Sequence, residues 1–531
     1  MMRPGVQSPA PGWTPASGGT SGIVLWWAVG LAGATFLSRL PFRSTQLFAW
    51  DSANFALALQ HYNVAWHQPQ PPGYILYVAA ARLLHFFVPD ANAAYVWLSV
   101  GASAAAVLCT VLLGSRLFGA FVGVLGGLVL ATSSLFWGQG EVAYPYAFLS
   151  LFTTLIVLLV VQSRWGRRDA SLLTAAVLAL AGGFRPELVP FLLPLWLFGA
   201  WHRPKWRWAV SGLLAAGLCA AWYIPMIQLS GGWTTYQEAS GGYFLYFLRS
   251  TSGFGKLLLG VLENTRTLVG YAYNGLGLAL LPIIYVGGRF FAPPRLARDH
   301  RAQVLALWIA PPLAFYLLIH IGNPGYLLSF LPALCLLAAH GTRVFADDLV
   351  EAAGLVWGKG ADGLPRIPVE SALWTTAALV ASIALTNAGL FLTASGEGRL
   401  REIRAIDRIL SRQVASIQAS FSAEQTILLA YDRSRQLRYY LPQHRIELLF
   451  PEPVVGHGYD PTRYWEKRRV LQVPAGVQYV LLPDLGQNRS EYPGPIRRLD
   501  LGDGVEMLVA DVKAGDEVRY GYQYVAVLSP G

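Results

Sequence analysis

The residues best suited to chemistry are acids, arginines, tyrosines and amides that lie in short polar segments between long apolar runs. They are Asp51, His67, Gln70, Tyr74, Arg82, Glu141, Tyr144, Arg185, Glu187, Asn323 and Tyr326. A carboxylate from this set could remove the proton of an acceptor hydroxyl, and a guanidinium could neutralise a departing phosphate. The set therefore suits the transfer of a group from a phosphate ester to a hydroxyl.

Two residues are enough for that reaction. We expect Asp51 to be the base and Arg185 to bind the phosphate, with Arg82 as a second cation for the same purpose. Each also has an ordinary structural explanation: Asp51 could be an interfacial acid, and Arg185 could form a surface ion pair with Glu187. Glu141 could simply complement a helix dipole.

Phosphate-binding motifs of nucleotide enzymes are missing from the sequence. It contains no GxxxxGK[ST] loop and no GxGxxG motif placed after a predicted strand. This absence favours a donor attached to a lipid phosphate, and no cofactor is implied. A divalent metal could bind His67 and Glu141, but two scattered ligands are a weak signal.

The elements that position these residues must lie in a membrane. The chain has 531 residues, of which 54% are hydrophobic and 13% charged, whereas soluble domains carry about 25% charged residues. The net charge of +10 does not indicate nucleic-acid binding, because the basic residues lie in short loops between apolar runs. Cys109, Cys219 and Cys335 lie within apolar runs and are expected to be buried thiols.

The apolar runs predict about eleven transmembrane helices. They cover 22–40, 92–113, 118–136, 145–162, 170–183, 186–200, 207–229, 267–288, 303–321, 324–343 and 372–394. Residues 73–88 form a further apolar helix that is short for a span and begins after two prolines, so we place it at the membrane interface.

Basic residues gather in alternate loops and thereby predict the orientation. They are Arg116, Arg164, Arg167, Arg168, Arg203, Lys205, Arg207, Arg289, Arg295, Arg298, Arg301, Arg343, Lys359 and Arg366. Loops rich in lysine and arginine remain cytoplasmic, so we expect the N-terminus inside and everything after residue 394 outside. The excess of arginine over lysine is typical of a GC-rich bacterial genome, which suggests the inner (plasma) membrane and a periplasmic or extracellular C-terminal part.

Composition divides the chain into three regions. Residues 1–21 are a disordered cytoplasmic tail, residues 22–394 form the transmembrane domain with its first outer loop at 41–91, and residues 395–531 form an extracytoplasmic α/β domain. Within the last region we expect strands at 426–430, 445–450, 477–482, 506–512 and 522–528, and helices at 398–419 and 434–441.

The sequence resembles the GT-C superfamily of glycosyltransferases, and most closely the protein O-mannosyltransferase and aminoarabinose transferase group (glycosyltransferase family 39-like). The likeness rests on Trp50-Asp51, on His67-Gln68-Pro69-Gln70-Pro71-Pro72-Gly73-Tyr74, on Arg116-Leu117-Phe118-Gly119 and on Tyr326-Leu327-Leu328-Ser329-Phe330-Leu331-Pro332-Ala333-Leu334. It implies an all-α polytopic bundle and a polyprenyl-phosphate sugar as donor. It also implies inverting transfer, with the first-loop aspartate as base.

Some positions depart from the pattern of this group. Ser52 follows Asp51 where many members carry a second acid, Glu141 stands near a usual aspartate, and Arg185 stands where a lysine is common. The acceptor therefore stays open and could be a glycan, a lipid or a protein. Two other functions were weighed: a transporter or flippase for a lipid-linked sugar, and a non-catalytic membrane scaffold.

Overall fold

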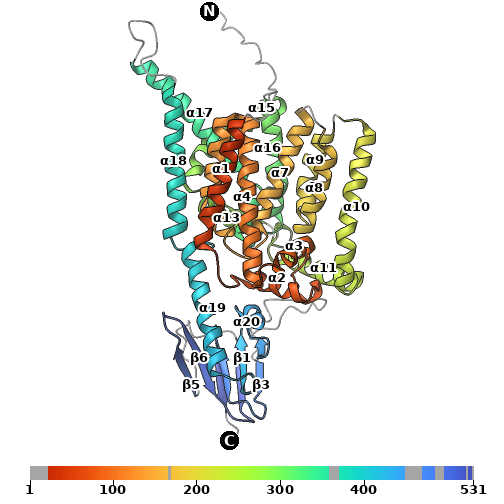
Figure 1. Cartoon of the computed structure of the whole chain (residues 1–531), viewed down its shortest axis with the longest axis vertical. Helices are drawn as coiled ribbons and strands as arrows, with labels where there is room; N and C mark the ends of the chain where they lie inside the picture. Colours follow the sequence, from red (N-terminus) through yellow and green to blue (C-terminus); the bar gives the residue numbers. More distant parts are fainter. Residues whose placement is uncertain are drawn as a thin grey trace, which may run out of the picture.

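The structure is a computed structural model that describes residues 22–165, 169–201, 203–256, 258–357, 370–448, 469–484, 495–521 and 524–528. A large helical bundle is followed by a smaller domain with β-sheets, which lies beneath the end of the bundle opposite the N-terminus (Figure 1). The tail predicted at 1–21 lies outside the described residues.

Long helices make up the bundle. They are α1 (Gly22–Arg39), α4 (Ala91–Phe118), α5 (Ala120–Thr132), α7 (Tyr146–Trp165), α8 (Ser171–Phe184), α9 (Leu188–Ala200), α10 (Lys205–Leu229), α13 (Leu258–Leu276), α14 (Leu280–Phe290), α16 (His300–Leu318), α17 (Leu331–Trp357) and α18 (Glu370–Thr393). Every apolar run predicted to span the membrane is therefore mainly helical.

Seven stretches in the described part of the chain are long and apolar enough to cross a membrane, so the protein is a multi-pass membrane protein. They are Gly22–Phe42, Ala91–Phe118, Tyr146–Trp165, Lys205–Leu229, Leu258–Phe290, His300–Leu318 and Glu370–Thr393. Helices α5, α8 and α9 have 13, 14 and 13 residues, which gives each only about 20 Å of length. The predicted runs coincide with helices, but the number of about eleven spans stays a prediction, because these three helices are shorter than a full crossing.

Shorter helices gather at the end of the bundle that faces the sheet domain (Figure 1). They are α2 (Trp50–Gln60), α3 (Ile75–His85) and α11 (Trp233–Ser250). The remaining short helices are α6 (Ser134–Gln139), α12 (Gly253–Lys256) and α15 (Pro293–Arg298). Helix α15 lies at the opposite end of the bundle. At 11 residues, α3 is about 16 Å long and cannot span a bilayer. This agrees with the interfacial helix expected at 73–88.

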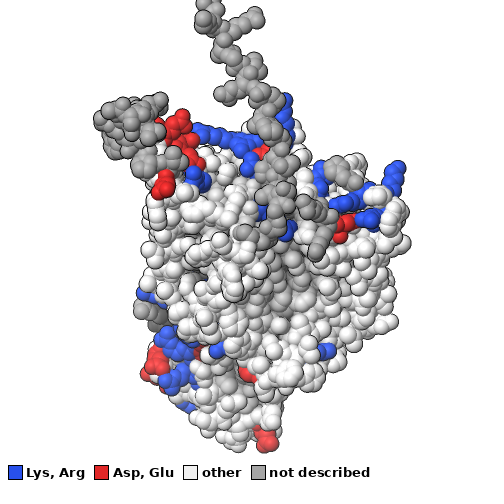
Figure 2. All heavy atoms as spheres, turned by 45° about the horizontal axis from the view of Figure 1, so that its top comes forward, with Lys and Arg blue, Asp and Glu red and all other residues white. Residues whose placement is uncertain are grey.

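Charged side chains avoid the middle of the molecule. On the face drawn in Figure 2, lysines and arginines with some acids lie along the rim near the N-terminus, mixed charges lie on the sheet domain, and the surface between them is almost uncharged. Such a belt is the surface that hydrocarbon tolerates, because ionised side chains are costly within a bilayer.

The C-terminal domain begins with the amphipathic helix α19 (Leu400–Ser420) and contains α20 (Ser434–Tyr440) and two sheets. The larger sheet has the order β2-β1-β4-β6-β5, and the smaller has the order β3-β7-β8. Their strands are β1 (Thr426–Ala430), β2 (Arg445–Leu448), β3 (Arg469–Gln472), β4 (Tyr479–Leu482), β5 (Ile496–Asp500), β6 (Glu506–Asp511), β7 (Glu517–Gly521) and β8 (Tyr524–Leu528). Strand β1 pairs in parallel with both β2 and β4, whereas β4–β6, β5–β6, β3–β7 and β7–β8 are antiparallel.

Both helices and five of these strands lie where the sequence predicts them, although residues 449–450 and 522–523 of two predicted strands lie outside the described part. The sequence does not predict β3, β5 and β7. In β5 the pattern Ile-Arg-Arg-Leu-Asp leaves three positions exposed, so it lacks the apolar alternation that reveals a half-buried strand.

Candidate active site

Asp51 lies in the first turn of α2, at the end of the bundle that faces the C-terminal domain. Its position in the first turn of a helix favours an ionised carboxylate, because the helix dipole is positive at that end. Burial works in the opposite direction and raises the pKa of Asp51 to about 6, an effect that the positive charge of Arg185 partly offsets. The group therefore titrates close to neutral pH, where a general base is most effective.

Arg185 caps the C-terminus of α8 and is almost completely buried, at 3% exposure. Its guanidinium forms an ion pair with Glu187. It also lies over the rings of Tyr74, Tyr146 and Tyr326, at 5.1, 4.9 and 5.5 Å from their centroids. Three aromatic rings around one guanidinium hold it in place while leaving its charge available to an anion.

Arg185 stays charged in this setting. Burial by itself would lower its pKa, but Glu187 and the surrounding tyrosines raise it well above its ordinary value. The Nε atom is buried and, among the described residues, has no hydrogen-bond partner. A buried donor without a partner is uncommon, and an anionic ligand would supply one.

The proline-rich part of the first loop is fixed by hydrogen bonds to its backbone. The Tyr62 hydroxyl donates to the Gly73 carbonyl at 2.6 Å, and the Tyr236 hydroxyl of α11 donates to the Pro72 carbonyl at 3.0 Å. Gly73 has φ +120°, and a Cβ there would lie 2.6 Å from the Met226 sulfur. The backbone is left-handed again at Tyr74, with φ 46°, and this turn places the Tyr74 ring against Arg185.

His67 and Gln70 lie in the same loop. Burial, with a smaller contribution from Arg435, lowers the pKa of His67 to about 4, so the ring is neutral near pH 7. It packs edge-on against Tyr243 of α11, with 6.1 Å between ring centroids. The buried Oε1 of Gln70 lacks a hydrogen-bond partner within the described part of the chain, so it remains available to a ligand.

Tyrosines connect the base to the cation. Tyr144 packs against Tyr146 at 5.2 Å, and Tyr146 packs against Tyr326 at 5.7 Å. Burial, then the nearby Asp51 charge, raises the pKa of Tyr144. Asn323 stabilises the start of the Tyr326 segment, since its side chain accepts from the Gly325 amide at 2.8 Å.

Two predicted site residues lie among other neighbours. Glu141 is fully buried and accepts a hydrogen bond from the Trp137 indole at 3.0 Å. Burial raises its pKa to about 8, against the opposing charge of Arg39. Arg82 donates to the Ala58 carbonyl at the C-terminal end of α2, at 2.7 Å. The structure therefore groups Asp51, Arg185, Glu187 and the tyrosines, and gives Glu141 and Arg82 separate contacts.

A metal site is not evident from these contacts. His67 packs on Tyr243 while Glu141 lies against Trp137 and Arg39, so the two potential ligands do not share neighbours. In the described ranges no group of three or more histidines, cysteines, aspartates or glutamates could hold a metal ion.

Several residues of the cluster were not predicted from the sequence. Tyr146 and Tyr243 face the site from α7 and α11. Glu397, just before α19, and Glu402, in the first turn of α19, act electrostatically on Tyr144. Arg435 of α20 lies 5.9 Å from the centroid of the Trp50 ring. Only Tyr146 could have been found from local sequence, because it follows the predicted Tyr144 by two positions.

Known structures share this arrangement of helices and domain. The chain matches ArnT from Cupriavidus metallidurans bound to undecaprenyl phosphate with a TM-score of 0.57 and 13% identity, over 93% of this chain and 99% of that one. It also matches the Archaeoglobus fulgidus oligosaccharyltransferase tethered with an acceptor peptide, with a TM-score of 0.51 and 11% identity, over 86% of this chain and 69% of that one. No protein-family model matches the sequence, and no curated protein matches it.

The fold defines this chain as a polytopic membrane protein with a C-terminal sheet domain. More particularly, the chain shares its fold with ArnT from Cupriavidus metallidurans and with the Archaeoglobus fulgidus oligosaccharyltransferase.

Proposed function

We propose that the protein is a membrane glycosyltransferase that moves a sugar from a polyprenyl-phosphate donor to an acceptor hydroxyl. The observation that supports this proposal best is the buried, tyrosine-lined cluster in which the Asp51 carboxylate interacts electrostatically with the Arg185 guanidinium. The fold supports the proposal, because a protein with the same architecture, ArnT, has been seen with undecaprenyl phosphate bound.

The reaction needs a base for the acceptor hydroxyl and a cation for the leaving phosphate, and different residues supply them. Asp51 accepts the proton of the acceptor hydroxyl while that oxygen forms a bond to the anomeric carbon of the sugar. The bond from this carbon to the phosphate oxygen breaks, and the electron pair leaves with the phosphate, which Arg185 neutralises. Attack opposite the leaving phosphate inverts the anomeric centre. His67, Gln70, Tyr74, Tyr144, Glu187, Asn323 and Tyr326 would line the space for sugar and acceptor, with Glu141 and Arg82 further away.

The proposed orientation places this site on the extracytoplasmic face of the inner membrane. The basic rim at the opposite end of the bundle (Figure 2) supports it, because such loops are retained in the cytoplasm. The transmembrane domain would comprise residues 22–394, and the domain at 395–531 would be periplasmic or extracellular. The acceptor would be a glycan, lipid or protein that reaches this face.

The proposal is tested with purified protein in lipid vesicles and a panel of polyprenyl-phosphate sugars, both hexoses and pentoses. Transfer or hydrolysis that requires the polyprenyl carrier is expected for at least one donor, measured as release of polyprenyl phosphate. Vesicles with a nucleotide-sugar as the only donor serve as the control. Carrier movement across the bilayer without any cleavage of the sugar would contradict a transferase and indicate a flippase.

The rate of transfer is expected to depend on the ionisation of Asp51. Because its pKa in the free protein is raised to about 6 and only the carboxylate can accept a proton, kcat/KM should rise with pH and level off above about pH 6. Below that value it should fall about tenfold per pH unit. A pH–rate profile between pH 4.5 and 8 tests this; a flat profile across pH 6 would exclude Asp51 as the base, provided that chemistry limits the rate.

A further inference from the structure

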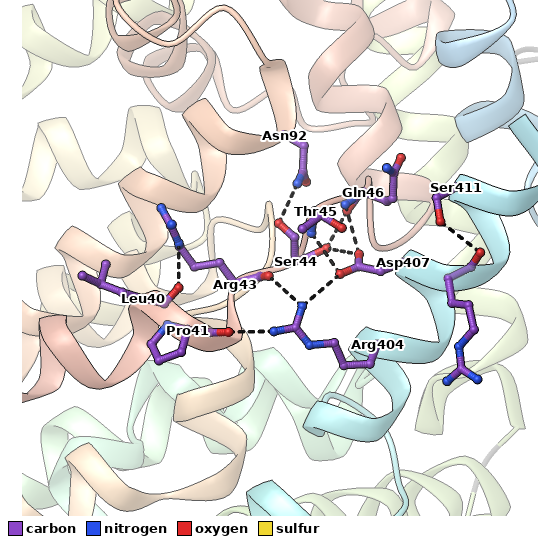
Figure 3. A network of polar contacts seen from close by, with 11 residues as sticks. Leu40, Pro41, Arg43, Ser44, Thr45, Gln46, Asn92, Arg404, Asp407 and Ser411 are labelled. Atoms are coloured by element: carbon purple, nitrogen blue, oxygen red, sulfur yellow. Dashed lines mark hydrogen bonds and ion pairs between the residues drawn. The ribbon is translucent and has the colours of Figure 1, made fainter. Parts of the chain in front are cut away.

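The segment that leads into α2 is held from outside the bundle by the first helix of the C-terminal domain. Asp407 of α19 is buried, at 6% exposure. Its carboxylate accepts the backbone N–H groups of Thr45 and Gln46, each at 3.0 Å. The Ser44 hydroxyl lies 2.8 Å from the same carboxylate. Figure 3 shows these contacts converging on a single side chain.

Arg404 binds the same segment one helical turn earlier. Its guanidinium donates to the Pro41 carbonyl at 2.7 Å and to the Arg43 carbonyl at 3.5 Å, and it lies 3.7 Å from the Asp407 carboxylate. One helix face therefore supplies acceptors to N–H groups and donors to carbonyl groups of residues 41–46 (Figure 3).

A third contact comes from α20. The Tyr440 hydroxyl accepts the N–H of Leu47 at 2.9 Å, and Arg435 lies over the ring of Trp50. Trp50 immediately precedes Asp51. The C-terminal domain thus contacts the chain at several residues between Pro41 and Trp50, the last of which precedes the proposed base.

The bundle makes fewer hydrogen bonds to the backbone of this segment, although Phe42 packs against Trp137 and Phe391 and Arg43 lies over the Trp97 ring. The Ser44 amide donates to the Glu141 carbonyl at 2.8 Å, and the Asn92 side chain donates to the Ser44 carbonyl at 2.9 Å. Both of these contacts involve Ser44 alone, so Thr45, Gln46 and Leu47 depend on the C-terminal domain for hydrogen bonds to their N–H groups. A backbone N–H that is removed from water needs such a partner.

We propose that Asp407 is a positioning residue for the reaction: with Arg404, it fixes residues 41–47 so that α2 begins where Asp51 faces Arg185. The C-terminal domain is then part of the catalytic machinery and not only a site for acceptors. This inference rests on the proposed function for its kinetic consequence, whereas the anchoring itself is independent of any substrate.

The kinetic test uses Asp407→Asn in the full-length protein. The amide keeps the shape but removes the charge, and its NH₂ group opposes one of the two N–H donors. We expect kcat to fall about tenfold or more, because small displacements of a reacting group are costly. The KM for the donor should change by less than about twofold, because the phosphate is bound by Arg185. Arg404→Gln, at a partly exposed position, is a milder variant in which the same direction of change is expected.

Asp516→Asn is the matched control. Asp516 is also buried, at 5% exposure, and its carboxylate accepts a backbone N–H, that of Lys513 at 2.8 Å. It lies between β6 and β7, in the same domain, and its contact is within the sheet region. A general loss of domain stability would affect both variants, whereas loss of positioning would affect only Asp407→Asn and Arg404→Gln.

Hydrogen exchange of peptides covering residues 43–60 tests the anchoring by Asp407 separately from the proposed transferase function. Faster exchange at Thr45, Gln46 and Leu47 in Asp407→Asn, and not in Asp516→Asn, is expected even without a donor. If the wild type transfers sugar and Asp407→Asn has an unchanged kcat, positioning by Asp407 is overturned. If the wild type transfers nothing from any donor, the proposed function fails, and unchanged exchange in Asp407→Asn would then overturn the anchoring as well.

Discussion

Replacement of Asp51 by asparagine should lower the turnover of the donor by about 10²–10⁴-fold, the range that general base catalysis contributes. Asparagine matches the size of aspartate but cannot accept the proton of the acceptor hydroxyl. Binding of the donor should persist, because Arg185 and its tyrosines remain in place. Single-turnover kinetics, together with equilibrium binding of the labelled donor, would separate these two effects.

The control for this variant comes from the same loop. Asp90 caps the N-terminus of α4, where its carboxylate accepts the Ala93 N–H at 2.7 Å at an exposed position. Asp90→Asn removes one negative charge from the same loop and should leave kcat within about twofold, because surface substitutions of this kind change little. Turnover by Asp51→Asn within about threefold of the wild type would show that another group is the base.

Replacement of Arg185 by glutamine should lower kcat by about 10²–10³-fold, similar to the loss of one charge-stabilising donor in other enzymes. It should also weaken binding of polyprenyl phosphate without sugar, because the buried cation is the proposed partner of the phosphate. Arg185→Lys should recover part of this affinity, since lysine supplies the charge but not the planar fork that lies among three rings. Binding of undecaprenyl phosphate and kcat are the two measurements.

Loss of Arg185 also leaves Glu187 without its ion-pair partner, which is destabilising at this partly buried position. The double variant Arg185→Gln/Glu187→Gln removes the unpaired acid and should fold better than the single variant. It should still bind polyprenyl phosphate weakly, because the cation is absent. If the double variant bound the phosphate as tightly as the wild type, Arg185 would have only a structural role.

The bundle could be predicted from the sequence because each apolar run is continuous and bounded by charged or turn-forming residues. Its shorter members, α8 and α9, lie where the apolar runs at 170–183 and 186–200 predict them. Two of the three missed strands, β5 and β3, each end a sheet, whereas β7 is the middle strand of the smaller sheet. Edge strands carry many polar side chains, so hydrophobic alternation does not reveal them.

The grouping of site residues could be predicted only in part. Asp51, Tyr74 and Arg185 were named from their residue types and their loops, yet contacts such as that between Tyr74 and Arg185 bridge 111 positions. Tyr243 was missed because it lies in an amphipathic helix without a recognisable motif. Asp407 was missed because an acid on a highly charged helix is usually a solvated one, and only its contacts with Thr45 and Gln46 show otherwise.

The bonds between Asp407 and the start of the first loop also have a consequence for how the protein is made. Thr45 leaves the ribosome 362 residues before Asp407, an interval of about 20–70 s at ordinary rates of synthesis. During this time the first spans can insert, but residues 41–47 lack the partner that orders them. In a nascent chain the first loop would therefore lie at the membrane without its ordering contacts. The chain could transfer sugar only after the last quarter of the polypeptide, which contains Asp407, has been made.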